Sequence, residues 1–403
     1  MSVSEAQAVE ASDASVRVVD VDSHVAEPLD LWTSRISPKW GDQIPAPVWD
    51  EAGGEYRWRV GESLLSGIGE YCTAGWHEPF PSHPPTLEEA DPACYTPAAR
   101  LRRLDDWGLA AQVLYPNIIG FDTHAFIEQL DPALALECVR AYNDFLAEFA
   151  SADPNRLIPI MMLPVWDPQA CVVEMKRARE LGHRGILFAA LFERIGLPGI
   201  TDPIWEPVLS AAQDFDLSVN FHVGFSVRTS LKSKSGWQMR TRNALAERTD
   251  RLSFVKRVTL GCTSNIEAAA HVVLQGVPAK YPRLKFVSVE SGFGYWPWVL
   301  EQMDWLWQSS GAYREFPDRD LPSEVWRRSF LATFWFEQYP LVQLENFADN
   351  VMFETDFPHE TSLPALGVNA AAHATESLRA AGVSSETTSK VLYGNAARLY
   401  GIH

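Results

Sequence analysis

Four short segments of this chain place acidic or imidazole side chains directly after apolar runs of strand length. The first is Val-Asp-Val-Asp-Ser-His at 19–24. The other three are Phe-His-Val-Gly at 221–224, Val-Glu-Ser-Gly at 289–292 and Glu-Thr-Asp-Phe-Pro-His at 354–359. Because side chains alternate along a strand, Asp22 and His24 point to one face and could reach the same ion. Imidazoles and carboxylates are typical ligands of a catalytic metal ion.

The elements that must position these residues alternate along the chain. Eight apolar runs have the length of strands: 18–21, 111–115, 158–163, 185–189, 217–221, 284–289, 330–334 and 351–354. Amphipathic stretches of helical length lie between them, at 98–107, 134–152, 168–181, 205–215 and 265–275. Strands that alternate with helices imply a parallel sheet. Eight such units favour an α/β fold of the (β/α)8 TIM-barrel type over an open doubly wound sheet, which stays the alternative.

Two connections are too long for simple loops. The segment at about 31–95 follows the first strand, is rich in Trp, Pro and Gly, and is expected to form a lid or pocket wall. The segment at about 224–261 follows the fifth strand and carries many Arg and Lys residues. We expect residues 1–16, which are acidic, small and polar, to be a disordered tail. Residues 17–403 would then form one barrel domain.

Composition excludes several classes of protein. The formal net charge is -18, from 34 basic and 52 acidic residues, which disfavours nucleic acid and anionic membranes as partners. No apolar stretch reaches the ~18 residues of a spanning helix. Five cysteines without a Cys-x-x-Cys pair indicate a reducing, cytoplasmic setting. No glycine-rich phosphate loop follows an early strand, which argues against a nucleotide-dependent oxidoreductase.

The four strand-end segments together predict more than any one of them. An Asp after a strand is usually a turn residue or helix cap, and a single His beside Phe221 is usually a core residue. In a barrel, however, the carboxyl ends of all strands meet at one mouth, where catalytic groups are found. The segments follow the first, fifth, sixth and eighth predicted strands, so their joint placement predicts one site.

These segments resemble a known family, the amidohydrolase-related metal enzymes typified by aminocarboxymuconate semialdehyde decarboxylase and γ-resorcylate decarboxylase. The resemblance covers the chain from Val18 to about Tyr400. The matching segments are 20–28, 100–116, 202–207 ahead of His222, 281–285, 290–292 and 355–359. Together they are specific for the family but do not select a substrate.

The resemblance implies a ligand set. His24, His222 and Asp356 fall on three metal-ligand positions, and Asp22 falls where the family has a histidine or an acidic residue. The fourth predicted strand, 185–189, has no lysine that could bridge two ions, so we expect one divalent ion. Zn²⁺ is the first expectation and Mn²⁺ the alternative, because this ligand set accepts both. No other cofactor is expected.

One position departs from the family. Where the decarboxylases carry a histidine after the sixth strand, this chain has Glu290. A buried carboxyl with a raised pKa could do similar acid or base work, or Glu290 could be a structural acceptor. His359 could orient a ligand or cap the turn. We therefore expect Asp356, Glu290 and His359 as catalytic residues. Four aromatic residues follow Glu290, and most of them are expected to pack an outer helix: Phe293, Tyr295, Trp296 and Trp298.

The resemblance implies a metal-dependent enzyme that acts on a small carboxylated or carbonyl-bearing substrate, aromatic or unsaturated, by nonoxidative decarboxylation or hydrolysis. It also suggests a homodimer. The acidic residues at positions 22 and 290 keep a second hypothesis open. In that case the barrel would be metal-free and would serve as a lyase or a ligand-binding module.

Overall fold

The computed structural model describes residues 16–225, 251–363 and 367–403. Nearly all of the predicted tail, 1–16, lies outside these ranges, as does most of the second predicted insertion with its basic residues. Among the helices that the model describes, none is both long enough and apolar enough to cross a membrane.

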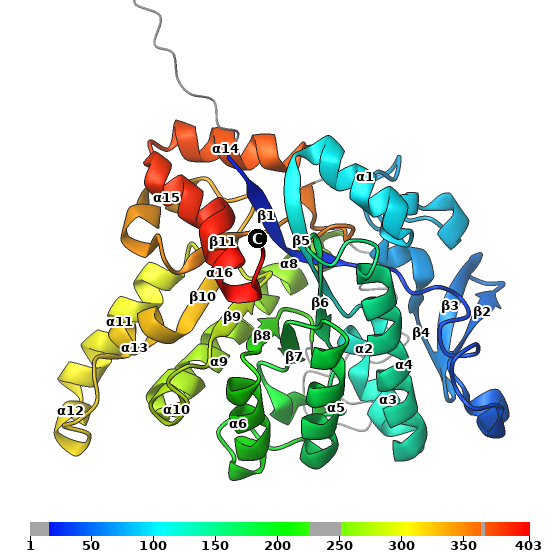
Figure 1. The fold of residues 1–403 in the computed structure, drawn as a ribbon, viewed down its shortest axis with the longest axis horizontal. Helices are drawn as coiled ribbons and strands as arrows, with labels where there is room; N and C mark the ends of the chain where they lie inside the picture. The colour runs from blue at the N-terminus through cyan, green and yellow to red at the C-terminus, as the bar shows by residue number, and fades with distance from the viewer. Residues whose placement is uncertain (1–15, 226–250, 364–366) are drawn as a thin grey trace, which may run out of the picture.

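The centre of the molecule is an eight-stranded sheet in the order β1-β5-β6-β7-β8-β9-β10-β11, and every neighbouring pair is parallel (Figure 1). The strands are β1 Val18–His24, β5 Leu109–Tyr115, β6 Leu157–Met161, β7 Gly185–Phe188, β8 Ser218–His222, β9 Phe286–Val289, β10 Phe330–Phe334 and β11 Val351–Phe353. Each of the eight apolar runs in the sequence corresponds to one of these strands. The predicted α/β barrel is therefore confirmed.

Two backbone hydrogen bonds join the ends of the sheet. The His24 N–H donates to the carbonyl of Phe357 at 2.7 Å, and the Asp356 N–H donates to the carbonyl of Asp22 at 2.9 Å. Both bonds link β1 to the segment that follows β11. An open sheet would leave these groups at two separate edges. The sheet is therefore a nearly closed barrel.

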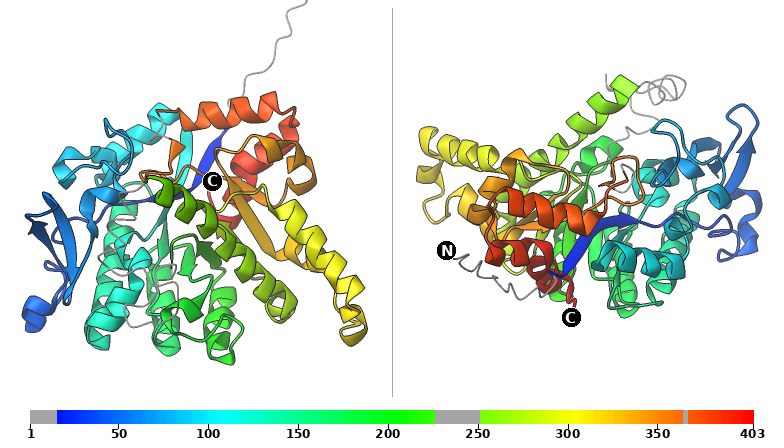
Figure 2. Two further views of the ribbon diagram at one scale, coloured as in Figure 1. Left: turned by 180° about the vertical axis from the view of Figure 1, so that it is seen from behind. Right: turned by 90° about the horizontal axis from the view of Figure 1, so that it is seen from above.

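The helices lie outside the sheet, as Figures 1 and 2 show. They are α1 Pro97–Trp107, α2 Ile118–Phe121, α3 Thr123–Gln129, α4 Pro132–Ala150, α5 Pro168–Glu180, α6 Glu206–Asp214, α8 Arg251–Gly261, α9 Thr263–Leu274, α10 Val277–Lys280, α11 Trp296–Ser309, α12 Ala312–Glu315, α13 Pro322–Ser329, α14 Ala370–Ala380, α15 Ser385–Ser389 and α16 Asn395–Tyr400. The five predicted helices correspond to α1, α4, α5, α6 and α9.

An Asp-Pro pair marks the start of several helical segments. Asp131 precedes α4 and accepts a hydrogen bond from the Ala133 N–H, while Asp167 precedes α5 and accepts from two backbone N–H groups. The aspartate satisfies free donors of the first turn, and the proline supplies a helical φ where no N–H is needed. The sequence therefore specifies these starting points locally.

The connection after β1 contains a separate antiparallel sheet of β2 Ala46–Asp50, β3 Glu55–Val60 and β4 Ser63–Gly67, at the right-hand side of Figure 1. A 3₁₀ helix, η2 Ile68–Tyr71, follows it. The chain then returns to the barrel, where the Ala74 N–H donates to the carbonyl of Pro358 at 3.0 Å. Part of the insertion therefore lies against the turn after β11.

Asp20 joins three segments of the barrel from a fully buried position on β1. Its carboxylate accepts hydrogen bonds from the Asp22 N–H at 3.2 Å and from the Gln112 side chain at 2.7 Å. It also accepts from the N–H and the hydroxyl of Thr355, at 2.8 and 2.6 Å. Asp20 therefore ties β1 to β5 and to the segment after β11, next to the closing backbone bonds.

We expect Asp20→Ala to lower the free energy of unfolding by about 3 kcal/mol, because it leaves several buried donors without an acceptor. Chemical denaturation followed by circular dichroism measures the change. Asp320→Ala is the matched control, since Asp320 pairs with Arg328 at the exposed surface and should cost less than about 1 kcal/mol. Equal effects of the two substitutions would contradict the structural role of Asp20.

Candidate metal centre

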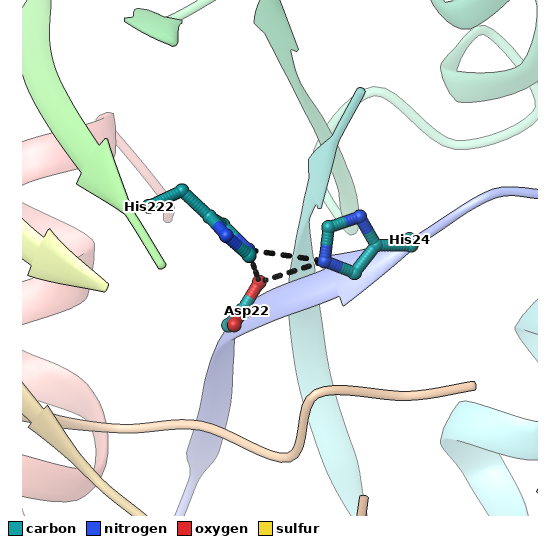
Figure 3. Close-up of side chains that lie close together, drawn as sticks. All are labelled: Asp22, His24 and His222. Atoms are coloured by element: carbon teal, nitrogen blue, oxygen red, sulfur yellow. Dashed lines mark hydrogen bonds and ion pairs between the residues drawn. The ribbon is translucent and has the colours of Figure 1, made fainter. Parts of the chain in front are cut away.

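Asp22 and His24 leave the end of β1 on the same side and meet His222, which ends β8 (Figure 3). The Nε2 atoms of the two histidines are 3.1 Å apart. The Oδ1 atom of Asp22 lies 3.2 Å from Nε2 of His222 and 3.5 Å from Nε2 of His24. All three residues are buried. The ligand atoms of the three residues thus converge on one place, although β1 and β8 are far apart in the sequence.

The protonation states suit a cation at this place. Nδ1 of His222 lies 2.6 Å from the carbonyl of Val223, a contact that places the proton on Nδ1 and leaves Nε2 free to bind. Burial, followed by the neighbouring His359 and His222, holds the pKa of His24 well below its ordinary value, so its ring is neutral. The two Nε2 atoms face each other, and both can bind a metal ion.

The buried atoms of the group also fit an ion. Oδ2 of Asp22 and Nδ1 of His24 have no hydrogen-bond partner among the described residues. Buried polar atoms are almost always paired, and an unpaired one calls for a missing water or ion. A set of imidazole nitrogens and carboxylate oxygens accepts Zn²⁺ and Mn²⁺ alike. The residues present therefore fit one divalent ion.

Asp356 and His359 complete the group from the turn after β11. Oδ1 of Asp356 is 3.7 Å from Nε2 of His24 and 2.8 Å from Nδ1 of His359. The other ring nitrogen of His359 lies 3.1 Å from the side-chain oxygen of Asn117, and its ring stacks on His24 at 3.9 Å. Burial lowers the pKa of His359, but the Asp356 carboxylate outweighs this and keeps the pKa above its ordinary value. His359 therefore holds the Asp356 carboxylate in place.

Glu290 follows the end of β9, and one of its carboxylate oxygens lies within 4.8 Å of carboxylate oxygens of Asp22 and Asp356. Its Oε2 atom is 3.5 Å from Nδ1 of His222, and its Oε1 atom lies 3.4 Å from the hydroxyl oxygen of Thr361. The same hydroxyl donates to Oδ2 of Asp356. One threonine therefore connects the two carboxyl groups that the sequence predicts to be catalytic.

The carboxyl of Glu290 carries a strongly raised pKa. Burial is the largest cause, and the carboxylates of Asp356 and Asp22 add to it because like charges nearby disfavour ionisation. Its side chain is 12% exposed, so one edge still faces the open side of the site. Burial and the neighbouring carboxylates therefore favour the neutral form of Glu290, which can donate a proton.

Both carboxyl residues that leave β9 and β11 have left-handed backbones, with φ of 53° at Glu290 and 57° at Asp356. Residues other than glycine rarely adopt this conformation, and they do so mainly at functional sites. Hydrogen bonds hold both: the Glu290 N–H donates to the buried carboxyl of Glu354 at 3.1 Å, and the Asp356 N–H donates to Asp22. The left-handed conformation therefore occurs at the two residues whose carboxyl groups lie in the cluster at the carboxyl ends of the strands.

All five predicted strand-end residues and His359 thus lie in one cluster. Thr361, Asn117, Glu354 and Phe121 belong to the same surroundings but had no predicted role. Asn117 follows the end of β5, so a search of strand ends for amides as well as acids would have found it. The ring centroid of Phe121 lies 5.4, 5.4 and 5.5 Å from those of His24, His222 and His359. No sequence pattern predicts this position of Phe121.

Two histidines of the insertion after β1 lie outside this cluster. His77 is exposed and rests on the ring of Trp76, with 4.3 Å between the centroids. His83 joins Glu55 at 2.5 Å in the insertion and lies near Glu70. Glu55, Glu70 and His83 thus form a second group of acidic and imidazole side chains, in the insertion after β1 and not in the barrel mouth.

The fold and this cluster define an α/β-barrel protein with a candidate metal centre at the carboxyl ends of its strands. The amidohydrolase family model matches residues 19–402, nearly the whole chain. The chain therefore belongs to the amidohydrolase family, as its sequence segments predict.

The decarboxylases to which this chain is similar share about a quarter of the aligned residues with it. A γ-resorcylate decarboxylase of Polaromonas sp. (strain JS666) is 24% identical over 324 residues, which span 75% of this chain and 87% of the relative. A γ-resorcylate decarboxylase of Rhizobium sp. (strain MTP-10005) is 24% identical over 316 residues, 75% of this chain and 86% of that protein.

Solved structures share the fold. An amidohydrolase from Mycobacterium avium subsp. paratuberculosis K-10 superposes with a TM-score of 0.73 at 20% identity, over 96% of this chain and 99% of that one. A 5-carboxyvanillate decarboxylase from Sphingomonas paucimobilis gives 0.60 at 18% identity, over 96% and 100%. A dihydroxybenzoic acid decarboxylase from Polaromonas sp. JS666, with bound manganese and 2-nitroresorcinol, gives 0.57 at 18% identity, over 96% and 97%.

We expect the purified wild-type chain to bind about one equivalent of Zn²⁺ or Mn²⁺, and His222→Ala to lose it, because the substitution removes one of two facing Nε2 ligands. Elemental analysis after dialysis measures the stoichiometry. His183→Gln is the control, since His183 is an equally buried histidine whose Nε2 faces the carbonyl of Asn143. Full metal occupancy in His222→Ala would refute the ligand assignment.

Proposed function

We propose that this chain is a metal-dependent decarboxylase that removes carbon dioxide without oxidation from a small aromatic acid, one with a hydroxyl beside its carboxylate. The observation that carries the proposal is the position of the Glu290 carboxyl, whose Oε2 atom lies 3.5 Å from the proposed ligand His222. The named relatives support it, because those of Polaromonas and Rhizobium are γ-resorcylate decarboxylases. The family as a whole also includes hydrolases, so the reaction needs a direct test.

Asp22, His24, His222 and Asp356 would hold the ion. When bound, the ion would supply positive charge that orients an anionic substrate and stabilises charge on its oxygens. Zn²⁺ and Mn²⁺ both suit the ligands. The solved Polaromonas decarboxylase, a structural neighbour, contains manganese, which favours a test of both metals.

The remaining step is a proton transfer that the chain's own residues would perform. The carboxyl of Glu290 gives its proton to the ring carbon that bears the substrate carboxylate. The bond from that carbon to the carboxylate then breaks, and its electron pair returns to the ring. Carbon dioxide leaves as a neutral molecule, and a solvent proton restores Glu290. The proton that was on Glu290 ends on the product, so the step is balanced.

The neighbours of Glu290 would prepare it for this step. Burial raises the pKa of the Glu290 carboxyl, and the charges of Asp356 and Asp22 raise it further, which favours the proton-donating form. Thr361 bridges Glu290 and Asp356 through its hydroxyl and so limits the rotation of both carboxyl groups. His359 fixes Asp356 from the other side. Asp356 is the second candidate for the proton donor, because it lies in the same group.

The deciding experiment incubates the Zn²⁺-loaded and Mn²⁺-loaded enzyme with a panel of hydroxybenzoates and ring-cleavage acids in D₂O. Release of carbon dioxide, with one deuterium on the carbon that lost it, would support the proposal. Hydrolysis of amide or ester analogues, without carbon dioxide from any acid, would replace it with the hydrolase alternative. Turnover that persists after complete metal removal would favour the metal-free alternative.

We expect Glu290→Gln to lower kcat for carbon dioxide release by about 100-fold or more, because glutamine keeps the shape but has no acidic proton. Metal content should stay near one equivalent, since Glu290 is not among the proposed ligands. Glu337→Gln serves as the control: Glu337 is a half-buried glutamate that accepts from the N–H of Phe293, outside the cluster. An unchanged kcat in Glu290→Gln would transfer the donor role to Asp356.

A further inference from the structure

The end of the barrel opposite the candidate metal centre contains a hollow of about 430 Å³. It lies where β8, β9, β10 and β11 begin, and the last helix, α16, borders it next to β11 (Figure 1). β8 runs from Ser218 beside the hollow to His222 at the candidate centre, so about 13 Å of strand separates the two places. The hollow is therefore distinct from the site of the proposed reaction.

The walls of this hollow are mainly basic, although the chain as a whole is acidic. Five basic side chains line it against two acidic ones, whereas the whole chain has 34 basic and 52 acidic residues. The basic residues are Arg283, Lys285, Arg327, Arg328 and Arg398, and the acidic ones are Asp216 and Asp349. A concave surface lined by one sign of charge concentrates ions of the opposite sign. The hollow therefore attracts anions.

Most of these cations have no carboxylate partner. Arg283 pairs with Asp214 at 3.5 Å, and Arg328 pairs with Asp320 at 2.6 Å. The remaining three form no ion pair with the residues that the structure describes: Lys285, Arg327 and Arg398. Exposed cations can be neutralised by solvent ions, but a group of them around one hollow offers a single place for an anion.

Lys285 and Arg398 lie close enough to repel each other. Burial lowers the pKa of Lys285, and the charge of Arg398 lowers it further. The Lys285 ammonium donates to the carbonyl of Arg328, and the Arg398 guanidinium donates to Oδ1 of Asn395 at 2.9 Å. Neutral oxygens therefore hold both cations in place, and neither contact cancels their charge. An anion between them would remove the repulsion.

Stability alone does not account for this arrangement. Residues at the amino-terminal end of a barrel ordinarily contribute to the stability of the fold. Two like charges that face one hollow instead oppose folding, since their repulsion is present only in the folded chain. The pair therefore needs an explanation in terms of a ligand.

We propose that this hollow binds a small organic phosphate, with its phosphate group between Lys285 and Arg398. Ammonium and guanidinium groups bind phosphate through charge-assisted hydrogen bonds. A phosphate monoester carries a charge of about -1.5 to -2 at neutral pH, which matches two unpaired cations better than one carboxylate does. Arg327, whose guanidinium lies 4.2 Å from the ring centroid of Phe347, adds a third cation.

The size and lining of the hollow argue for an organic body beside the phosphate. Pockets for small organic molecules measure about 300–1,000 Å³, a range that includes this hollow. Apolar side chains also form part of its wall: Leu217, Leu284, Phe330, Leu331 and Leu399. An inorganic ion would use the cations and leave this apolar surface uncovered. A sugar or nucleoside that carries the phosphate would cover both parts.

Isothermal titration calorimetry of the purified protein tests the inference, with adenosine monophosphate and glucose phosphate as probes. We expect at least one of them to bind once per chain, inorganic phosphate to bind about 10-fold more weakly, and uncharged adenosine and glucose not to bind. Lys285→Met/Arg398→Met should weaken binding of the probe by about 10-fold or more, because it removes two charged donors.

Arg35→Met/Lys39→Met is the matched control. It removes the same two charges, but Arg35 already pairs with Glu148 at 2.6 Å and Lys39 with Glu137 at 3.1 Å, away from the hollow. This variant should bind the probe as the wild type does. Circular dichroism should be unchanged in both variants, which separates a lost site from a lost fold.

Three results would overturn the inference. The first is a wild type that binds neither organic phosphate at millimolar concentration. The second is unchanged binding in Lys285→Met/Arg398→Met, because the probe would then occupy another place, such as the metal centre. The third is equal weakening in the control, since overall charge would then explain the effect. The outcome is independent of the proposed reaction, because the hollow lies at the other end of the barrel.

Discussion

The two backbone hydrogen bonds between β1 and the turn after β11 bring the candidate centre together. They join Asp22 and His24 to Asp356 and Phe357, which are more than 330 residues apart in the chain. Asp20 reinforces the same junction with two further hydrogen bonds, both from Thr355. Because the backbones of Asp22, His24 and Asp356, all proposed ligands, make these closing bonds, the geometry of the site and the integrity of the barrel depend on the same contacts.

The site concentrates groups that repel one another or resist burial. Asp22, Asp356, Glu354 and Glu290 are carboxyl residues within one largely buried group, and unpaired buried charges are costly. The protein meets this cost in two ways. Glu290 and Glu354 have pKa values well above the ordinary range, which keeps them neutral, and the remaining carboxylates face imidazole rings. A divalent ion among them would remove the remaining repulsion, which is why the arrangement fits a metal centre.

The periphery of the barrel carries features that the site does not need. The antiparallel sheet of β2, β3 and β4 extends the connection after β1, and its continuation rests against the turn after β11. On the other side, α11 exposes two tryptophans to the surroundings. Barrel enzymes vary most in such additions, because the central sheet already supplies the core.

The sequence by itself determined the fold and the positions of the main site residues. Apolar runs of strand length alternate with helical stretches, and Asp-Pro pairs mark helix starts, all of which are local signals. The side-chain alternation of a strand also placed Asp22 and His24 on one face. Such signals do not depend on where the rest of the chain lies.

Tertiary structure alone decided how these residues act on each other. Thr361 connects Glu290 with Asp356, and the ring of Phe121 lies against histidines from three other segments. The left-handed backbone of Glu290 is held by a contact with another strand. The raised pKa of Glu290 has the same origin, because it arises from burial and from carboxylates on other strands. The exposure of Trp298 beside the buried Trp296 likewise follows from how α11 is seated. Contacts between distant segments have no local pattern, so only the folded chain defines them.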